Sequence, residues 1–511
     1  MKLCLHSTEC LNFRLRLCLF SKMNCRKGAI CKVIGESVDD WSSLASECQD
    51  YAECCGFLIR KKGNDDQQTT IMGSMTLFPT KYPKSMYNKA LAVQSAYNEL
   101  YHKVANDYDF LKEALMGTAA ADDFVQRQLE LYDTVHREGP AALFSLAIVR
   151  SDYMYECTDG FNFKLGQIEF NTMASSMAAV STKVGKVHRY MARILEDPCL
   201  YNGDSYPVND AVPAIADSII KAWLLYSNPK AVVMFVLGKK DSNFADIRSI
   251  EYAILERNPD VKVVMKTADA LQKTSFLNED KRLIIDDNIE VALVYYRSLY
   301  APNGMTEEFW NLRLLIERSK AIKCPSIPYQ LAGTKKVQQE LSRPGVVERY
   351  LSPEKAAQVR STFVGLYSLK NKEVVEAAKA NPHRYVLKPQ REGGGNNTYG
   401  EDIVAKLHEI ERLGESDAYI LMERIQPTKQ YNCKLNGIVG NYCRCEPTVS
   451  ELGIYGAIIG NEDEISYNTT AGYLLRTKLQ HVDEGGFCAG YSAIDTPYLL
   501  SDEDMLKEIG E

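Results

Sequence analysis

The sequence predicts a mixed α/β fold, and three observations lead to this prediction. Residues 229–330 alternate short apolar runs with segments of helical periodicity, which is the pattern of a small parallel α/β unit. Residues 39–139 carry apolar side chains at spacings of three and four, which is typical of packing helices, and we assign these helices no chemistry. Further along, the apolar run 385–387 leads into a glycine triplet, as a strand does where it becomes a loop. A chain of 511 residues is long enough for two or three domains.

The composition indicates which partners to expect. Hydrophobic residues make up 45% of the chain and charged residues 25%, the proportions of an ordinary soluble globular protein. A net charge of -7 and a pI near 5.7 argue against nucleic acid or an anionic membrane as the main partner. No apolar run approaches the roughly 18 residues of a membrane-spanning helix. The chain has 15 cysteines, and this odd total predicts free thiols in a reducing compartment.

The first 32 residues differ from the rest of the chain in charge. Seven basic side chains stand here against a single acidic one, Glu9. This bias is typical of an organellar transit peptide, whereas Arg14 and Arg16 interrupt the apolar core that a secretory signal would need. An extension without function, with Met23 as an alternative start, explains the pattern equally well.

The segment 388–397, Lys-Pro-Gln-Arg-Glu-Gly-Gly-Gly-Asn-Asn, follows the apolar run that predicts a strand. Three glycines without Cβ atoms let backbone N–H groups come close to an anion. Lys388 and Arg391 add cationic donors that suit phosphate oxygens, and Glu392 beside phosphates indicates a Mg²⁺ ligand. The segment therefore predicts a nucleotide-phosphate loop with its own metal ligand. The alternative is a flexible linker, although a linker gives no reason for charged residues to gather at the glycines.

A second candidate site lies on two predicted strands. Residues 146–149 lead to Arg150, and residues 165–171 predict the neighbouring strand. In the second strand Glu169 and Asn171 alternate with apolar residues, so both polar side chains project from one face. Two oxygen ligands side by side make half of a hard-cation site. For this segment alone, the solvated face of an edge strand is the simpler interpretation.

The α/β unit offers a third candidate site. Ligands on open α/β sheets bind beyond the carboxyl ends of the strands. Residues 241–243, Asp-Ser-Asn, follow one predicted strand there, and residues 297–300, Arg-Ser-Leu-Tyr, follow another. An arginine and a tyrosine at this position suit a small molecule with carboxylates, although ordinary polar residues at strand ends explain the pattern as well.

Two segments carry a family resemblance. The glycine loop at 388–397 resembles that of the eukaryotic glutathione synthetases, which are ATP-grasp ligases, and the segment 330–345 is similar to the same family almost letter for letter. The similarity runs from about Thr76 to near the C-terminus. It implies an ATP-grasp catalytic domain at 33–228 and 329–511 with a lid at about 362–446, and an inserted substrate-binding α/β domain at 229–328. Residues 1–32 stay outside it as a targeting or disordered extension. The family also implies a cytoplasmic homodimer.

The resemblance implies the activity as well, which is ATP-dependent ligation of γ-glutamylcysteine to glycine through an acyl phosphate, with ATP and Mg²⁺. Stabilising a transferring phosphoryl group takes cations more than acid–base residues. A site rich in lysine, arginine and metal ligands agrees with this chemistry. None of the seven histidines falls in a motif, which speaks against a hydrolase triad or a zincin.

Carried over position by position, the resemblance implies roles for individual residues. The groups implied in catalysis are Arg150, Lys335, Lys388 and Arg476, and the metal ligands are Glu169, Asn171 and Glu392. The residues implied around ATP are Glu169, Lys335, Lys388, Pro389, Gln390, Arg391, Glu392, Gly393, Gly394, Gly395, Asn396, Asn397, Tyr399, Met422, Glu423, Arg424, Ile425, Glu451, Lys478 and Glu484. The residues implied around the peptide and the amine are Arg150, Met173, Ala174, Ser175, Ser176, Asp241, Ser242, Asn243, Ile247, Arg297, Ser298, Leu299, Tyr300, Arg476, Phe487 and Cys488.

Three departures from the family pattern fall in the peptide pocket. Ala174 stands where the family has a serine, Ile247 where it has a glutamine, and Phe487 with Cys488 where its acceptor loop has small residues. Each lost polar partner of a substrate costs roughly 1–3 kcal/mol. An ordinary glutathione synthetase with tolerated substitutions is therefore one hypothesis. The others are a diverged ligase with another donor or amine, such as β-alanine, and a non-catalytic nucleotide- or peptide-binding relative.

Overall fold

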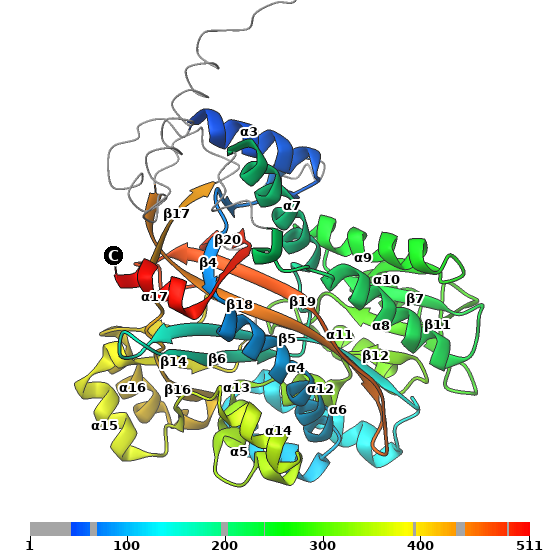
Figure 1. Ribbon diagram of the computed structural model, residues 1–511. Coiled ribbons are helices and arrows are strands. Elements are labelled where there is room, and N and C mark those ends of the chain that lie inside the picture. Colours follow the sequence, from blue (N-terminus) through cyan, green and yellow to red (C-terminus); the bar gives the residue numbers. More distant parts are fainter. Residues whose placement is uncertain are drawn as a thin grey trace, which may run out of the picture.

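The computed structural model describes residues 42–61, 69–195, 203–239, 241–391, 395–435, 445–487 and 490–510. This part of the chain forms five sheets, two of them with only two strands, and the three larger sheets organise it (Figure 1). A long central sheet crosses the middle of the molecule, a mixed α/β layer lies to its right in this view, and a small helix-covered sheet lies at the lower left. The basic segment 1–32 lies outside the described residues.

The central sheet has seven strands in the order β17-β3-β20-β19-β18-β5-β6. Their bounds are β17 (Gln430–Leu435), β3 (Met75–Thr76), β20 (Ser492–Asp495), β19 (Ile465–Leu479), β18 (Cys445–Gly460), β5 (Ser145–Cys157) and β6 (Phe163–Asn171). Apart from the parallel pair β20–β3, these strands pair antiparallel. The predicted strands at 146–149 and 165–171 are therefore neighbours, as expected.

Alternation along β5 sends apolar side chains into two cores, one on each face of the sheet. Ile148 belongs to the core packed under α7 (Ala178–Leu195) and α8 (Ala211–Tyr226). Its neighbours Ala147 and Val149 belong to the opposite core, packed under α4 (Lys84–Ala105). A strand buried on both faces reads as a continuous apolar run, and this is why residues 146–149 were recognisable in the sequence.

The second sheet has six strands. Five of them follow the order β8-β7-β11-β10-β9, and the sixth, β12, also pairs with β11. Its strands are β7 (Val232–Leu237), β8 (Val263–Thr267), β9 (Phe276–Leu277), β10 (Leu283–Ile285), β11 (Ile289–Tyr296) and β12 (Ile322–Cys324), and its helices are α9 (Phe244–Arg257), α10 (Ala268–Thr274) and α11 (Glu307–Glu317). β7, β8, β11 and β12 run parallel, as the alternation predicted. β9 and β10 add an antiparallel edge that the sequence did not indicate.

The third sheet is antiparallel and has the order β13-β16-β14-β15. Its strands are β13 (Leu366–Ser368), β14 (Tyr385–Pro389), β15 (Thr398–Tyr399) and β16 (Tyr419–Glu423), covered by α15 (Lys372–Ala380) and α16 (Asp402–Leu413). Leu387 and Leu421 pack with Ile403 and Leu407 of α16 in a separate small core. The strand predicted to precede the glycine loop is β14, so the loop leaves the end of this sheet.

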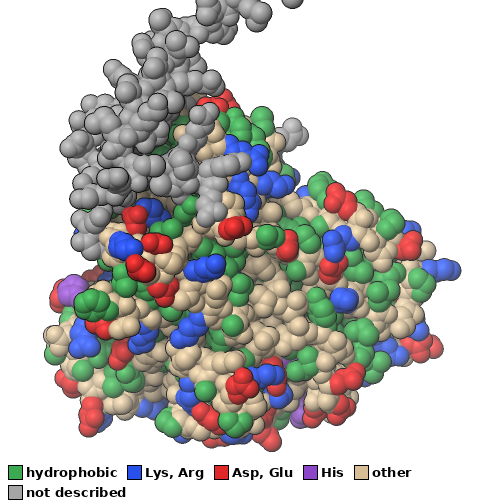
Figure 2. Space-filling model, in the orientation of Figure 1, with side chains coloured by type: hydrophobic (Ala, Val, Ile, Leu, Met, Phe, Trp, Pro, Cys, Tyr) green, Lys and Arg blue, Asp and Glu red, His purple; other side chains and the backbone are tan. Residues whose placement is uncertain are grey.

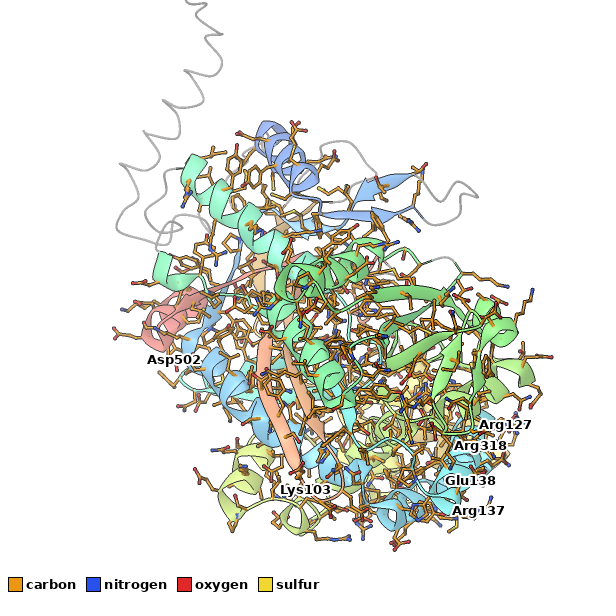
Figure 3. All side chains as sticks on the ribbon, turned by 90° about the vertical axis from the view of Figure 1, so that its right-hand side faces the viewer. Lys103, Arg127, Arg137, Glu138, Arg318 and Asp502 are labelled. Atoms are coloured by element: carbon orange, nitrogen blue, oxygen red, sulfur yellow. A yellow bond between two sulfur atoms is a disulfide. The ribbon has the colours of Figure 1, made fainter. Side chains whose placement is uncertain are left out.

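The remaining elements surround these sheets. They are α3 (Ser42–Cys54), β1 (Leu58–Arg60), β2 (Thr70–Met72), β4 (Thr80–Pro83), α5 (Tyr108–Ala121), α6 (Asp123–Glu138), α12 (Ile327–Ala332), α13 (Lys335–Ser342), α14 (Pro353–Arg360), β21 (Pro497–Leu500) and α17 (Asp502–Gly510), with short 3₁₀ turns at Gly203–Ser205, Val347–Arg349, Pro382–Arg384 and Ser416–Ala418. Figure 3 shows Arg318, next to the end of α11, beside Glu138 at the end of α6, with two hydrogen bonds of 2.5 and 2.8 Å between them. This pair ties the α/β layer to the helical part of the molecule.

The surface agrees with the composition. Figure 2 shows basic and acidic side chains interspersed over most of the visible face, with one small group of basic side chains near the top. Among the described residues, no helix combines the length and the apolar character needed to cross a membrane.

The expectation of free thiols holds for Cys48, Cys54, Cys55, Cys157 and Cys324, but not for two other described cysteines. Cys433 on β17 and Cys445 on β18 are directly paired across the sheet and form a disulfide. Counting cysteines could not reveal this bond, because the strand register alone brings the two thiols together.

Candidate active site

Strand register brings the polar groups of the central sheet to one place. Arg150 on β5 lies opposite Asn171 on β6, and Asp152 lies opposite Glu169. On the neighbouring pair of strands, Glu451 of β18 lies opposite Arg476 of β19. Since β5 and β18 are adjacent, the side chains on one face of four strands point into a common cavity.

This cavity has a volume of about 380 Å³, and the third sheet forms its opposite wall. It gathers most of the described residues that the sequence singled out. They are Arg150, Glu169, Asn171, Met173, Ala174, Ser175, Ser176, Tyr300, Lys388, Asn397, Tyr399, Met422, Glu423, Arg424, Ile425, Glu451, Arg476, Lys478, Glu484 and Phe487.

Other predicted residues do not line the cavity. Pro389, Gln390, Arg391, Gly395, Asn396, Asp241, Ser242, Asn243, Ile247, Arg297, Ser298, Leu299 and Lys335 are absent from its walls. Glu392, Gly393, Gly394 and Cys488 lie outside the described residues. Lys335 still reaches the site, because its Nζ lies 3.9 Å from Oε2 of Glu169.

A buried network of charges occupies the floor of the cavity. Arg150 donates two hydrogen bonds to Asp152, from Nε at 2.6 Å and from Nη2 at 2.7 Å. Arg476 donates to the same carboxylate at 3.1 Å, and it also pairs with Glu451. A Cβ at Gly453 would lie 2.6 Å from Oδ1 of Asp152 and 2.7 Å from Cδ of Arg150. Glycine at this position on β18 therefore leaves room for the Arg150–Asp152 pair.

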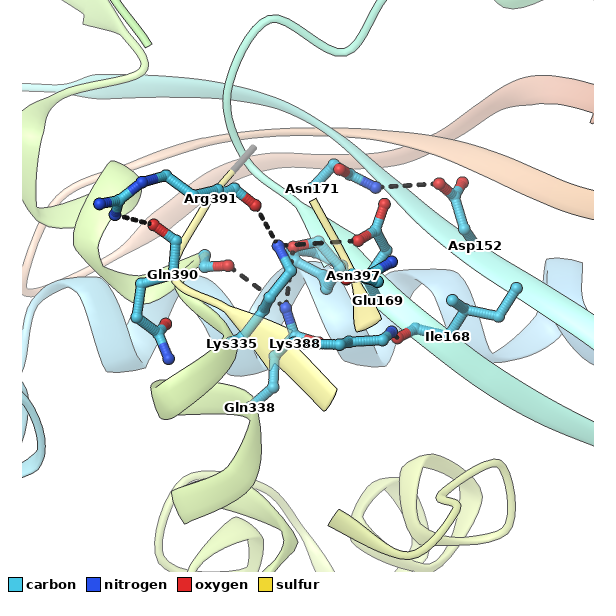
Figure 4. A network of polar contacts seen from close by, with 12 residues as sticks. Asp152, Ile168, Glu169, Asn171, Lys335, Gln338, Lys388, Gln390, Arg391 and Asn397 are labelled. Carbon is cyan, nitrogen blue, oxygen red and sulfur yellow. Dashed lines mark hydrogen bonds and ion pairs between the residues drawn. The ribbon is translucent and has the colours of Figure 1, made fainter. Parts of the chain in front are cut away.

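Lysines surround the carboxylate of Glu169 (Figure 4). Burial alone would raise the pKa of Glu169, but the charges of Lys335, Lys388, Arg476 and Arg150 together lower it to about 2. Lys388 donates from Nζ to the carbonyl oxygen of Ile168 at 3.1 Å, and burial lowers its pKa to about 8. The carboxylate is thus ionised at neutral pH, and the cations beside it exceed what one carboxylate can neutralise.

The glycine loop offers two backbone donors to an anion. The N–H groups of Gly395 and Asn397 donate to the carboxylate of Glu484, at 2.8 and 3.3 Å. A carboxylate held by these amides shows that the described end of the loop can bind an anion, as its sequence predicts.

The Arg391 side chain takes another direction. Its guanidinium pairs with Asp122, at the start of α6, and donates to the carbonyl of Gln390 at 2.7 Å. Figure 4 shows it directed away from Lys388 and Glu169. The Arg391 carbonyl instead accepts a hydrogen bond of 2.6 Å from Nζ of Lys335. In the structure, Arg391 therefore holds Lys335 in place through its backbone.

An apolar part of the cavity lies beside the third sheet. Met422 and Ile425 were singled out in the sequence, and the structure adds Met154, Ile168, Val386 and Val449. Sequence reasoning missed these four because an apolar residue on a strand looks the same whether it faces a core or a ligand. Glu423 stands at the edge of this region, where its carboxylate accepts a hydrogen bond of 2.8 Å from the Tyr367 hydroxyl.

The opposite end of the cavity faces the α/β layer. Here Met173, Ala174 and Met177 line the wall with Tyr300, and two of them have a left-handed backbone, with φ of 49° at Ala174 and 79° at Met177. Non-glycine residues in this conformation are uncommon and gather at functional sites. Two hydrogen bonds hold the backbone of Ser176 in place. Its carbonyl oxygen accepts one from the Tyr455 hydroxyl at 2.5 Å and one from Arg150 at 3.3 Å.

Behind this wall lies a second buried ion pair. Arg297 donates to Asp246 at 3.0 Å, and Asp246 also accepts from the backbone N–H groups of Met177 and Ala179. Asn243 belongs to the same cluster, and its buried Oδ1 accepts no hydrogen bond from any described residue. Ile247 is only 2% exposed and packs into the core, so its side chain does not face the cavity.

Two of the three predicted metal ligands fit a hard cation. Asn171 donates through its amide nitrogen to the Arg150 carbonyl and to Asp152, which leaves its carbonyl oxygen Oδ1 to act as a ligand. The ionised carboxylate of Glu169 supplies the second oxygen. Among the described residues, no cluster of three or more His, Cys, Asp or Glu residues could hold a metal by itself. A pair of oxygen ligands completed by a bound phosphate suits Mg²⁺, which keeps few protein ligands.

An apolar slot, a loop that binds anions and a carboxylate set among lysines are typical of a nucleotide-binding site. The comparisons identify the family. The model described as "Eukaryotic glutathione synthase, ATP binding domain" matches residues 39–499. The chain therefore belongs to the eukaryotic glutathione synthetase family.

Relatives from animals and plants agree. The chain is 39% identical to the glutathione synthetases of Xenopus laevis and Homo sapiens, with 89% of this chain and 96% of each relative covered. It is 39% identical to the chloroplastic glutathione synthetase of Arabidopsis thaliana, with 86% and 81% covered.

A solved structure shows the same fold. The glutathione synthetase-like effector GSS30 from Globodera pallida superimposes with a TM-score of 0.72 at 25% identity, over 90% of this chain and 97% of that chain. The predicted α/β fold class is confirmed.

Proposed function

We propose that the protein is a glutathione synthetase, an ATP-dependent ligase that joins the terminal carboxylate of γ-glutamylcysteine to the amine of glycine. The observation that carries the proposal is the position of Glu169. Its carboxylate is ionised among Lys335, Lys388, Arg150 and Arg476, between an apolar slot and a polar floor. Membership of the family supports the use of ATP.

We place the adenine in the apolar slot made by Met154, Ile168, Val386, Met422 and Ile425. The phosphates then run toward Lys335, Lys388 and the N–H groups of Gly395 and Asn397, and Glu423 stands near the ribose. Lys478 extends the positive charge, because its Nζ lies beside the backbone of Asp483 at the edge of the same cavity. This assignment gives each phosphate a cationic or N–H partner.

We assign Mg²⁺ to Glu169 and Asn171, with Glu392 as the third protein ligand. When bound, the ion would neutralise charge on the phosphates and orient the terminal phosphoryl group.

The remaining groups act on the peptide. Arg150 and Arg476 hold its terminal carboxylate, while Ser176 and Tyr300, which line the cavity, bind the rest of the dipeptide. Asn243 and Arg297, which the family resemblance also implies, lie behind the wall of the cavity, where both contact Asp246. A carboxylate oxygen attacks the terminal phosphorus of ATP and the bond to ADP breaks, which gives an acyl phosphate. The amine of glycine then attacks the acyl carbon, phosphate leaves, and the amine loses a proton. Fixed cations suit this sequence because charge develops on the transferring phosphoryl group and then on the acyl oxygen.

A second candidate is a ligase with another donor or amine. The apolar side chains of Met173, Ala174 and Met177 at the donor end, two of them in strained backbone conformations, favour this alternative. A non-catalytic binding protein is the third candidate. The lysines and arginines around Glu169 count against it, because a protein that only binds has no need of paired lysines and metal ligands.

The test is a reconstitution. Purified protein is incubated with ATP, Mg²⁺ and γ-glutamylcysteine, with glycine, with β-alanine or without amine, and ADP release and product mass are followed. Glycine-dependent ADP release with the tripeptide as product supports the proposal. Turnover with β-alanine alone supports the diverged ligase, and absence of turnover with every amine supports the binding protein. Glu392→Ala tests the third metal ligand, and full activity in that variant would refute it.

We also propose the assembly and the location implied by the family. The protein is a cytoplasmic homodimer, in which residues 33–228 and 329–511 form the catalytic domain and residues 229–328 the substrate domain. Two plant relatives are named as chloroplastic, which makes residues 1–32 a candidate targeting segment. Fluorescent fusions with and without these residues decide whether they direct the chain to an organelle, and sedimentation measures the assembly.

A further inference from the structure

The loop that follows β19 carries Phe487, a buried residue that also lines the cavity. We propose that Phe57, Gly73 and Phe487 form an aromatic clamp that fixes this loop, and that the clamp positions the amine acceptor. The inference rests on the proposed function and on the family resemblance, which assigns the loop that contains Phe487 to the amine. Sequence reasoning gave Phe57 and Gly73 no role, and it treated Phe487 as added bulk in the pocket.

The clamp is a three-way contact at one backbone atom. A Cβ built on Gly73 would lie 2.8 Å from Cζ of Phe57 and 3.0 Å from Cζ of Phe487, so both rings lie against the same glycine. Phe57 is fully buried and Phe487 is 7% exposed, and both belong to the core that contains Met72 and Met75. A side chain at position 73 would force the two rings to shift, because real Cβ atoms essentially never approach another atom within about 3 Å.

The described residues of the loop are held at the two ends by polar contacts. Ser492 donates to the Gly485 carbonyl at 2.8 Å, and Lys434 donates to the Gly490 carbonyl at 2.8 Å. Backbone hydrogen bonds from Gly490 to Phe487 and from Tyr491 to Gly486 close the turn. The Phe487 ring adds an apolar attachment between these ends. Gly485, Gly486 and Phe487 all line the cavity, so a shift of the ring moves backbone that faces the substrates.

The clamp also connects the acceptor side to the donor side. Phe57 directly precedes β1, and Gly73 directly follows β2, so both belong to one two-stranded ribbon. The same ribbon reaches the start of α9, where the Arg60 N–H donates to the Ser242 carbonyl at 2.9 Å and the Arg60 guanidinium lies 4.8 Å from the centre of the Phe244 ring. The ribbon therefore contacts the loop that contains Phe487 and the residues on both sides of Asn243, which are Ser242 and Phe244.

Amide formation depends on the distance between the amine and the acyl carbon, and a misplacement of about 1 Å can cost a large factor in rate. A loosened clamp displaces the loop backbone that faces the amine, so it should weaken binding of the amine as well as slow its attack, and it should leave the nucleotide slot intact. The expected result is therefore a different change in KM for each of the two substrates. The KM for the amine should rise roughly tenfold while the KM for ATP changes by less than about twofold.

The experiment uses Gly73→Ala, Phe57→Leu and Phe487→Leu in the full chain, with Gly203→Ala as the matched control. A Cβ at Gly203 meets nothing within 4 Å, so the control adds the same methyl group where space is open. KM and kcat are measured for the amine and for ATP, and amide hydrogen exchange is followed in peptides covering 484–492. We expect a raised KM for the amine and faster exchange in all three variants, even for Phe57→Leu, which lies far from the loop in sequence.

Three outcomes would overturn the inference. One is unchanged exchange and unchanged KM for the amine in Gly73→Ala and Phe57→Leu. Another is an equal rise in the KM for ATP and the KM for the amine, which indicates general loss of structure. The third concerns the double variant Phe57→Leu with Phe487→Leu. If its effect on the KM for the amine equals the sum of the two single effects in free energy, the rings do not act through one contact, because rings that share a contact must be coupled. If the unaltered protein does not turn over with any amine, the proposed function fails, and the exchange data still decide whether the clamp holds the loop.

Discussion

Arg150 and Asp152, two residues apart on the same face of β5, are joined by two hydrogen bonds of 2.6 and 2.7 Å. Asp152 is fully buried and also accepts a hydrogen bond from Arg476, so one carboxylate holds two arginines that would otherwise repel each other. Sequence reasoning selected both arginines and missed the aspartate between them.

Asp152→Asn should therefore lower the free energy of unfolding by about 3–5 kcal/mol, because it leaves buried positive charge without a partner. The matched control is Asp217→Asn. Asp217 makes the same paired contact with Arg257 at 2.5 and 2.6 Å, but both side chains are more than a third exposed. The control should cost less than about 1 kcal/mol. Urea denaturation measures the free energy of unfolding of both variants. An equal decrease in the two would contradict the role of Asp152 as the buried partner of two arginines.

The affinity for ATP should depend on pH through two lysines. Burial lowers the pKa of Lys478 to about 8, and it lowers the pKa of Lys388 to about 8 as well. Both ammonium groups are therefore charged at pH 7 and lose their protons as the pH rises through 8. Since phosphates bind the charged forms, the logarithm of the KM for ATP should rise above pH 8 with a slope approaching about two per pH unit.

Lys478→Arg tests this pH dependence, because arginine stays protonated throughout the range. The slope of the variant should fall to about one, since Lys388 alone still titrates. An unchanged slope would show that Lys478 does not contact the nucleotide.

Glu169→Gln keeps the shape of the side chain and removes its charge. Lys335 and Lys388 then lose their counter-ion and the metal loses an anionic ligand, so kcat should fall roughly 10²–10³-fold. Steady-state ADP release measures the effect. Glu503→Gln, at a side chain that is 81% exposed on α17, is the control and should keep full activity. Normal turnover by Glu169→Gln would remove the basis of the metal assignment.

The disulfide between Cys433 and Cys445 should contribute about 3 kcal/mol to stability, because it closes a loop of 12 residues and restricts the unfolded chain. The double variant Cys433→Ala with Cys445→Ala should be less stable by this amount without reductant. Dithiothreitol should lower the stability of the unaltered protein to that of the variant and leave the variant unchanged. If reductant affects both equally, the bond does not form in solution.

The sequence predicted the parts of the site that depend on local pattern. The alternation of polar and apolar residues put Glu169 and Asn171 on one face of a strand, and the strand register places Arg150 on the same face. Their assignment as metal ligands came from the family resemblance and stays a prediction. The glycine loop was recognisable because glycines and charges are contiguous.

Other features depend on partners far away in the chain. Arg391 turns to Asp122, which lies 269 residues earlier, and this choice of partner cannot be read from the loop itself. Ile247 packs into the core, whereas the sequence suggested a lost pocket contact. Val386 and Ile168 face the cavity, although an apolar residue on a strand gives no sign of whether it faces a core or a ligand. In each case tertiary packing decides the direction of a side chain, and local pattern contains no information about it.

The placement of β5 beside β18 also governs how the chain is made. Arg150 leaves the ribosome early, whereas its neighbours across the sheet come from residues near 455, and Arg476 follows Asp152 by 324 positions. Until almost the whole chain has been synthesised, β5 has β6 on one side and no strand on the other. A nascent or truncated chain that ends before residue 445 would expose a long apolar edge, which is prone to aggregation. We therefore expect shortened transcripts of this gene to yield insoluble protein that needs chaperones, instead of a partly active enzyme.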